Sequence, residues 1–188
     1  MATTVLEHPA IGKVVGNAES EDVTKYLGIQ HATLADRFSP PQMKQYAPDG
    51  EVDATKNGYI KSPSTSNLNV WPYADDVYRP QVLALPNGAD FEYTLLQQSL
   101  DYDRDAVRMS DIDGLNLNIF VPNPENGAST SASSRNLPVF AFIHGGGFNG
   151  GSGSFPAHEM TRFVRLSIAK GTPIIAVAMK YGFRSQLS

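Results

Sequence analysis

Three apolar segments in the second half of the chain have patterns that are typical of β-strands. Residues 115–121 alternate apolar and polar side chains, which predicts a half-buried strand that ends at Pro122. Residues 138–143 form an unbroken apolar run, so we expect a strand that is covered on both faces. Residues 174–179 form another apolar run and predict a third strand.

A helix is predicted between the last two of these strands, over residues 157–170. Its apolar side chains recur at helical spacing and would form one buried face: Met160, Phe163, Val164 and Ile168. Lys170 followed by Gly171 predicts its end, since a cation suits the C-terminal dipole and glycine suits the left-handed conformation. A strand, a helix and a strand in this order predict a βαβ unit with parallel strands and a right-handed crossover.

The first half of the chain shows weaker periodicity. Residues 11–16 and 23–29 have the composition of two strands joined by a polar turn over residues 17–22, which predicts a hairpin. Residues 35–110 are rich in Pro, Gly, Asn, Asp and Ser and predict a long, loop-rich excursion. A short helical turn is expected within it, at residues 95–100.

Composition and charge narrow the class of protein. The chain has 188 residues, is 41% hydrophobic and carries a net charge of −4, so we expect residues 1–188 to belong to a single domain with no separate second domain. No block of Lys and Arg points to nucleic acid, and no apolar run is long enough to span a membrane. The chain has no cysteine, no Asn-x-Ser/Thr sequence and no basic, apolar start, which favours a cytoplasmic location over secretion.

Three consecutive glycines after the unbroken apolar run are the clearest functional signal. They lie in the sequence His144-Gly145-Gly146-Gly147-Phe148, at the carboxyl end of the predicted strand. Glycine allows close approach to backbone N–H groups, and fixed N–H donors are what an oxyanion hole requires. The 188 residues contain no Gly-x-Ser-x-Gly, the sequence that carries the nucleophile in α/β-type serine hydrolases. The sequence therefore predicts the oxyanion donors without a matching nucleophile.

A second interpretation of these glycines is a dinucleotide-binding loop. Gly145-x-Gly147-x-x-Gly150 matches the fingerprint G-x-G-x-x-G and follows a predicted strand. That fingerprint should open its helix at once, whereas a further Gly- and Ser-rich stretch intervenes here, and the acidic residue expected near the end of the next strand is absent. We therefore favour the oxyanion interpretation and expect no cofactor.

No metal site is predicted. The aspartates of residues 101–105 resemble the opening of a calcium loop, but the glycine and the glutamate that such a loop requires are missing. The four histidines show no ligand spacing. We expect His144 to pack beneath the glycine loop and His158 to lie on the surface near the start of the helix.

Taken together, three segments resemble the type-B carboxylesterase/lipase family, which includes the cholinesterases, and residues 97–99 and 110–115 are most similar to a fungal branch of it. Residues 26–32 resemble the family's G-I-P-Y-A segment, residues 114–122 its C-L-x-L-N-[IV]-x-x-P strand, and residues 138–148 its oxyanion strand and loop. The chain departs from the family in lacking the early disulfide cysteine, and in having Lys180-Tyr181 where Asn-Tyr-Arg is common.

The resemblance implies an α/β-hydrolase fold, with this chain as the N-terminal portion: an antiparallel hairpin followed by the first parallel strands of a larger sheet. It implies hydrolysis of a small carboxylic ester by a serine nucleophile, with Gly146 and Gly147 as the loop donors to the oxyanion. The family's nucleophile, acid and histidine would lie beyond Ser188, so we expect no catalytic triad residue in this chain and no activity from it alone. The alternative is a non-catalytic binding remnant of the same scaffold.

Overall fold

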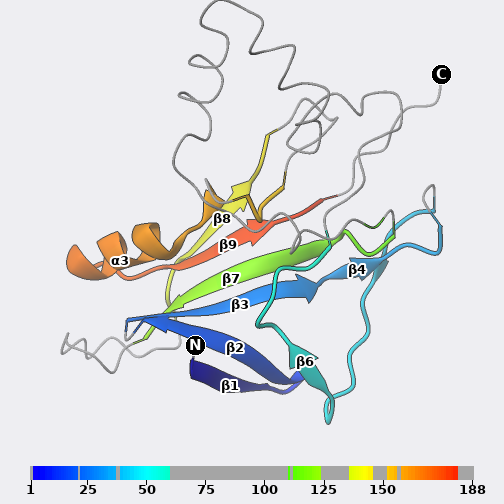
Figure 1. Ribbon diagram of the computed structural model, residues 1–188, viewed down its shortest axis with the longest axis horizontal. Helices are drawn as coiled ribbons and strands as arrows, with labels where there is room; N and C mark the ends of the chain where they lie inside the picture. Colours follow the sequence, from blue (N-terminus) through cyan, green and yellow to red (C-terminus); the bar gives the residue numbers. More distant parts are fainter. Residues whose placement is uncertain are drawn as a thin grey trace, which may run out of the picture.

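In the part of the chain that the structure describes, a mixed β-sheet has helix α3 (Thr161–Ala169) packed on it (Figure 1). The computed structural model describes residues 2–20, 22–36, 39–59, 110, 112–123, 136–145, 152–155 and 158–181. The seven strands of the main sheet are β1 (Ala2–His8), β2 (Gly12–Ser20), β3 (Val23–Gln30), β6 (Glu51–Asp53), β7 (Asn116–Pro122), β8 (Val139–Ile143) and β9 (Ile175–Met179). A separate pair joins β4 (Ala32–Thr33) to β5 (Gln42–Met43).

The order and direction of the strands determine which strand ends lie together along each side of the main sheet. The strands lie in the order β1-β2-β3-β7-β9-β8, with β6 added in parallel to β2. All neighbouring pairs along this path are antiparallel except β8 and β9, which are parallel as the βαβ pattern predicts. The carboxyl ends of β3, β8 and β9 therefore point to one edge, where β7 begins.

The predicted hairpin is present, but its turn is shorter than the sequence indicates. The expected turn over residues 17–22 is wrong, because β2 continues to Ser20 and pairs with β3. Asn17 is buried in this strand, and its side-chain amide donates to the carbonyl of Thr55 at 2.6 Å. Strand β1 has no counterpart in the predictions, because its mostly exposed residues lack the alternation that marks a half-buried strand.

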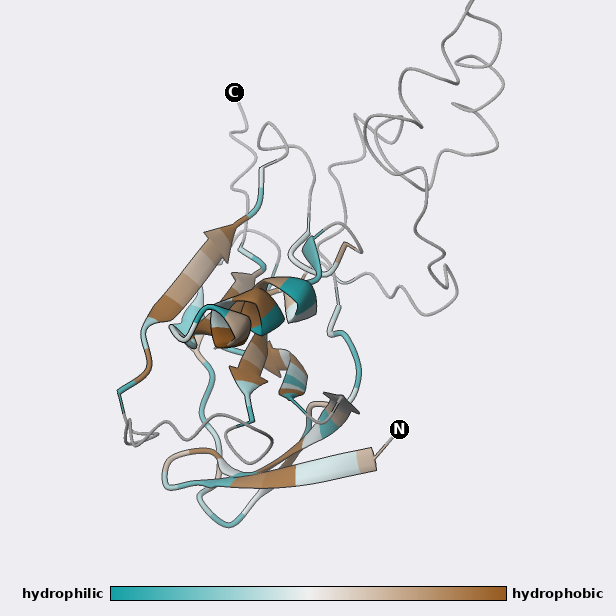
Figure 2. Ribbon diagram, turned by 90° about the vertical axis from the view of Figure 1, so that its left-hand side faces the viewer, coloured by the Kyte–Doolittle hydropathy of each residue, from teal (hydrophilic) through white to brown (hydrophobic). Residues whose placement is uncertain are grey.

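Two hydrophobic clusters lie on the described sheet. The first gathers around α3: Val23, Phe120, Val164, Ala176 and Ala178. The second forms around β2 and β3: Val14, Tyr26, Ile29 and Ala54. Figure 2 shows apolar residues, in brown, on both the helix and the strands behind it.

The central strand β7 is covered on both faces, which corrects the prediction of a half-buried strand. Leu117 and Ile119 pack against the second cluster, as the alternation predicts. The polar positions that alternate with them are even less exposed, at 1% for Asn116 and 2% for Asn118. Buried amides need hydrogen-bond partners, and those partners come from loops that the alternation does not reveal.

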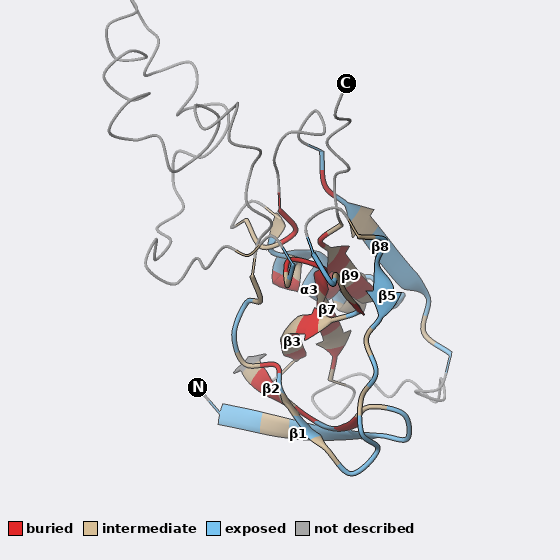
Figure 3. Ribbon diagram, turned by 90° about the vertical axis from the view of Figure 1, so that its right-hand side faces the viewer, coloured by how far each residue is buried: buried red, intermediate tan, exposed pale blue. Residues whose placement is uncertain are grey.

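Strand β8 is more exposed than an unbroken apolar run suggests. Val139 and Ile143 keep 61% and 63% of their surface exposed, because β8 is the outer strand of the sheet in the described part of the chain. Figure 3 shows both outer strands, β1 and β8, as mostly exposed. The expectation of a strand covered on both faces is therefore wrong for this chain.

Helix α3 starts later than predicted and ends where predicted. It begins at Thr161 instead of residue 157 and ends with Lys170 as its C-cap. Gly171 follows with a φ of +71°, the left-handed conformation expected after a helix. Val164 is fully buried on the helix face that meets the sheet. Phe163 stays 39% exposed and contacts Phe140 edge-on, at 4.9 Å between ring centroids.

Candidate active site

The candidate site lies at the edge of the sheet where β8 and β9 end. Ile143 pairs with Met179 at the last position of the two parallel strands. His144 and Lys180 follow these two residues directly, so the register places them side by side. Ligand sites of open α/β sheets form at this carboxyl edge.

His144 is held at this edge through both its main chain and its ring. Its side chain is buried, and its Nδ1 lies 2.9 Å from the carbonyl oxygen of Gly145. A carbonyl only accepts hydrogen bonds, so Nδ1 carries the proton. The Tyr181 hydroxyl donates to the main-chain carbonyl of His144 at 2.6 Å, and the two rings stack at 4.5 Å between centroids.

The surroundings of His144 favour its neutral form. Burial is the largest cause that lowers the pKa of His144 below its ordinary value of 6.5. The hydrogen bond to Gly145 acts in the opposite direction, whereas the charges of His158 and Lys180 lower the pKa further. A neutral imidazole with a fixed tautomer therefore supports the start of the glycine loop.

Lys180 connects this edge to two distant segments. Its buried ammonium donates to the carbonyls of Gly58 at 3.0 Å and Tyr59 at 3.5 Å. Its main-chain N–H donates to the carbonyl of Asn116 at 2.8 Å, and its carbonyl accepts from Nε2 of His31 at 3.1 Å. Lys180, the first residue after β9, thus links the end of β3, the start of β7 and residues 58–59.

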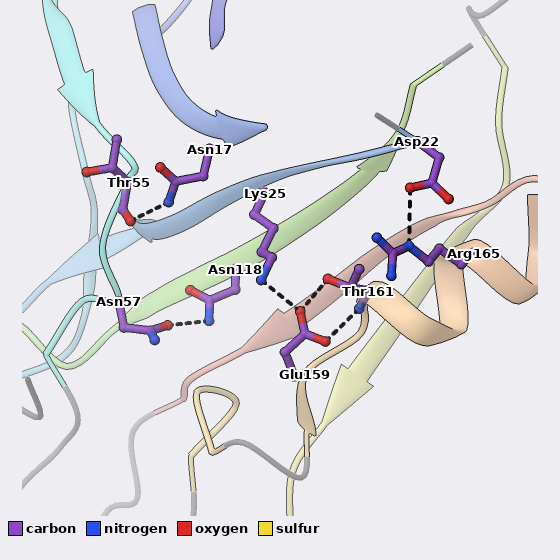
Figure 4. A network of polar contacts seen from close by, with 9 residues as sticks. All are labelled: Asn17, Asp22, Lys25, Thr55, Asn57, Asn118, Glu159, Thr161 and Arg165. Carbon is purple, nitrogen blue, oxygen red and sulfur yellow. Dashed lines mark hydrogen bonds and ion pairs between the residues drawn. The ribbon is translucent and has the colours of Figure 1, made fainter. Parts of the chain in front are cut away.

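The two buried amides of β7 bind the loops that cover them. Asn118 donates to Oδ1 of Asn57 at 2.8 Å and to the hydroxyl of Ser154 at 3.1 Å, and it accepts from the N–H of Gly28 at 2.8 Å. Figure 4 shows the bond between Asn118 and Asn57. Asn116 donates to the carbonyl of Tyr59 at 2.7 Å, while its buried Oδ1 has no partner among the residues that the structure describes.

A turn over residues 152–155 lies against the end of β9. A Cβ added to Gly153 would come within 2.9 Å of the carbonyl oxygen of Met179, so only glycine fits there. His158 donates from Nδ1 to the carbonyl of Ser152 at 2.8 Å, and its ring lies 4.7 Å from that of Phe142. His158 is half-buried and bonded, which corrects its expected place on the surface.

The structure places only part of the predicted site. His144 and Gly145 lie at the carboxyl edge of the sheet, as the sequence predicts. Gly146, Gly147 and Phe148 lie outside the described residues, as do Gly150 and the helical turn expected at residues 95–100. The oxyanion donors therefore stay a prediction.

Sequence analysis assigned no part in the site to Lys180, Tyr181 or the two asparagines of β7. A usable signal was present for the asparagines, since two amides in one central strand must find partners when the strand is buried. In the described segments, no group of three His, Cys, Asp or Glu side chains could hold a metal ion. The helix of the described part is too short and polar to cross a membrane.

Comparisons with known proteins agree on one family. A model of the carboxylesterase family matches residues 2–184. Lipase 3 of Yarrowia lipolytica is 26% identical over 178 residues, which cover 94% of this chain and 30% of that protein. Lipase 2 of Diutina rugosa is 33% identical over 163 residues, which cover 84% of this chain and 25% of that protein.

Solved structures show the same fold. The crystal structure of Aspergillus niger EstA superimposes with a TM-score of 0.57 at 22% identity, covering 97% of this chain and 26% of that one. The juvenile hormone esterase of Manduca sexta gives the same TM-score and identity, with 97% and 27% covered. The predicted α/β-hydrolase fold class is confirmed, and this chain spans about a quarter of the length of these proteins.

Proposed function

The chain belongs to the carboxylesterase family, and from this premise we propose that it supplies the oxyanion-binding loop of an enzyme that hydrolyses carboxylic esters. The observation that carries the proposal is the family match over residues 2–184, which includes the three glycines that follow β8. The proposal is supported by the parallel strands β8 and β9, since β8 ends at the carboxyl edge of the sheet, where such sites form.

In the proposed reaction a serine attacks the carbonyl carbon of the ester, and the carbonyl oxygen becomes an oxyanion. The N–H groups of Gly146 and Gly147 donate hydrogen bonds to this oxyanion. Loss of one such donor costs about 3 kcal/mol of transition-state stabilisation, or roughly a hundredfold in rate. A histidine of the triad, oriented by an acid, takes the proton from the serine and gives it to the leaving alkoxide as the acyl–oxygen bond breaks, and water then releases the acyl group from the serine as the carboxylic acid. The resemblance does not assign the histidine or the acid to any of these 188 residues.

The chain by itself is proposed to be catalytically silent. Its 188 residues contain no Gly-x-Ser-x-Gly, so no activated serine of this type is present in them. Oxyanion donors without a nucleophile and its base cannot support covalent catalysis. The substrate of the complete reaction is a small carboxylic ester.

Two proteins test the proposal. One is this chain alone, and the other, the joined polypeptide, carries residues 2–184 in place of the matching quarter of the Diutina rugosa lipase. We expect the joined polypeptide to hydrolyse p-nitrophenyl butyrate, and its variant with the lipase's nucleophilic serine changed to alanine to be inactive. We expect no turnover from this chain alone.

Each outcome has a distinct meaning. A joined polypeptide that melts cooperatively but hydrolyses no ester contradicts the proposed esterase role. Turnover by this chain alone, abolished by a serine-directed organophosphate, contradicts the proposed silence. If the chain is folded and monodisperse, but no ester is hydrolysed by the chain alone or by the joined polypeptide, the binding remnant is favoured instead.

A further inference from the structure

We propose that Tyr181 is a positioning residue that fixes the direction of the first glycine peptide by holding His144. This proposal depends on the proposed esterase for its purpose, because a fixed peptide matters only where an oxyanion must be bound. Its structural part concerns Tyr181, His144 and Gly145 alone, all of which the structure describes.

Gly145 is little covered by the residues that the structure describes. It is exposed, and a Cβ added to it would meet nothing within 4 Å in the described part of the chain. Glycine also allows backbone directions that other residues resist. Among the described residues, the hydrogen bond that holds the Gly145 carbonyl is the one from Nδ1 of His144, at 2.9 Å.

Tyr181 holds both parts of His144 on which that hydrogen bond depends. Its hydroxyl donates to the His144 carbonyl at 2.6 Å, which fixes the main chain. Its ring stacks on the imidazole with 28° between the planes, which fixes the rotation of the side chain. The pairing of Ile143 with Met179 fixes the ends of two adjacent strands, and His144 and Tyr181 follow these ends by one and two residues.

The direction of the Gly145 carbonyl decides what the loop presents to a substrate. A carbonyl that pointed into the site would repel an oxyanion, whereas one bonded to His144 is expected to point away from it. In a planar trans peptide the N–H points opposite to the C=O. Holding the carbonyl against the imidazole is therefore expected to present the N–H of the same peptide as a donor.

A purely structural role for Tyr181 makes a different prediction, and Tyr46 provides the matched control. The Tyr46 hydroxyl donates to the main-chain carbonyl of Gln30 at 2.7 Å, at the end of β3. Tyr181→Phe and Tyr46→Phe each remove one hydroxyl-to-carbonyl hydrogen bond and keep the ring. If Tyr181 only stabilised the fold, both variants would affect His144 to the same small extent.

Nitrogen-15 NMR of the histidine rings in this chain separates the two roles. A His144→Asn variant identifies the His144 signal among the four histidines. We expect a protonated Nδ1 in the unaltered chain at neutral pH, and about tenfold faster exchange of that proton with water in Tyr181→Phe. Tyr46→Phe is expected to leave the exchange rate within about twofold. Equal effects of the two variants, or an unprotonated Nδ1, overturn the proposal.

The joined polypeptide distinguishes this inference from the proposed function. Tyr181→Phe is expected to lower kcat about tenfold at an unchanged KM, because donors that act in the transition state are displaced. Full kcat in Tyr181→Phe, with ester hydrolysis intact, overturns the positioning role alone. No hydrolysis by the folded, unaltered joined polypeptide overturns the esterase role, and the NMR comparison then decides on Tyr181 by itself.

Discussion

Lys25 and Glu159 join the sheet to the start of the helix. The ammonium of Lys25, on β3, lies 3.2 Å from Oε1 of Glu159 (Figure 4). The same carboxylate accepts the main-chain N–H of Thr161 at 3.0 Å and also the Thr161 hydroxyl. A negative charge at this position suits the positive end of the helix dipole. A single carboxylate thus fixes where α3 begins and how it lies on the sheet.

Replacement of Glu159 is expected to destabilise the chain. Glu159→Gln keeps the size of the side chain and an oxygen for Thr161 but loses the charge opposite Lys25. Lys25 is only 13% exposed, so its ammonium would lose one oppositely charged neighbour in a partly buried place. We expect a loss of about 1 to 2 kcal/mol in the free energy of unfolding, measured with urea.

A more exposed ion pair on the same helix is the control. Arg165 lies 3.2 Å from Asp22, with 44% and 37% of the two side chains exposed. Arg165→Gln is expected to cost less than about 0.5 kcal/mol, because solvent screens this pair more strongly. Equal losses for Glu159→Gln and Arg165→Gln would show that burial at Lys25 does not strengthen its ion pair.

Two glycines with the same backbone conformation should respond differently to a methyl group. Gly28 and Gly171 have φ values of +70° and +71°. A Cβ on Gly28 would lie 2.5 Å from the N atom of Gly58, whereas one on Gly171 would meet nothing in the described part of the chain. We expect Gly171→Ala to cost about 1 kcal/mol and Gly28→Ala about 3 kcal/mol or more in the free energy of unfolding.

Thermal and urea unfolding of both alanine variants would measure this difference. The Gly28→Ala change should also weaken the hydrogen bond from its N–H to Asn118, since the backbone must move to relieve the clash. Similar losses at the two positions would mean that the left-handed conformation alone determines the cost.

Core packing under the helix gives a third prediction. Val164 is fully buried in the first hydrophobic cluster, whereas Leu166 on the same helix is 54% exposed. Val164→Ala is expected to cost about 2 kcal/mol through lost burial and the cavity it leaves. Leu166→Ala should change the free energy of unfolding by less than about 0.5 kcal/mol, in the same urea experiment. A larger effect at Leu166 would indicate that its exposed side chain is covered in solution.

The elements that sequence analysis predicted well are those whose pattern is local. The strand at Ile175–Met179, the helix end at Gly171 and the parallel pairing of β8 with β9 follow from apolar runs and a stop signal. Burial could not be predicted in the same way. An apolar run such as Val139–Ile143 is typical of a covered strand, but its exposure depends on which strands lie beside it.

The polar contacts of the candidate site depend on residues that are far apart in sequence. Lys180 donates a hydrogen bond to Gly58, which is 122 positions away in the sequence, and Asn118 donates one to Asn57, which is 61 positions away. No local periodicity carries such information, so the sequence predicts the glycine loop but does not predict these long-range contacts. His144 is the exception, because its place directly before the three glycines predicts a packed side chain, and its ring is buried.

The stability of the chain is expected to depend on pH through His144. Burial first, and then the charges of His158 and Lys180, lower the pKa of His144 in the folded chain below the ordinary value of 6.5. Below pH 6.5 the unfolded chain therefore binds more protons at this residue than the folded chain does. Stability at this site is complete above pH 6.5 and decreases as the pH falls toward the folded-state pKa.

Urea unfolding at several pH values between about 5 and 8 tests this sign and its origin. The unaltered chain should lose stability toward the acidic end, whereas His144→Gln cannot titrate and should show a flatter dependence. His144→Gln is less stable at neutral pH, since the stacking on Tyr181 is lost, so the slopes and not the absolute values are compared. Parallel slopes in the two proteins would place the acid sensitivity at another residue and contradict the neutral, buried state of His144.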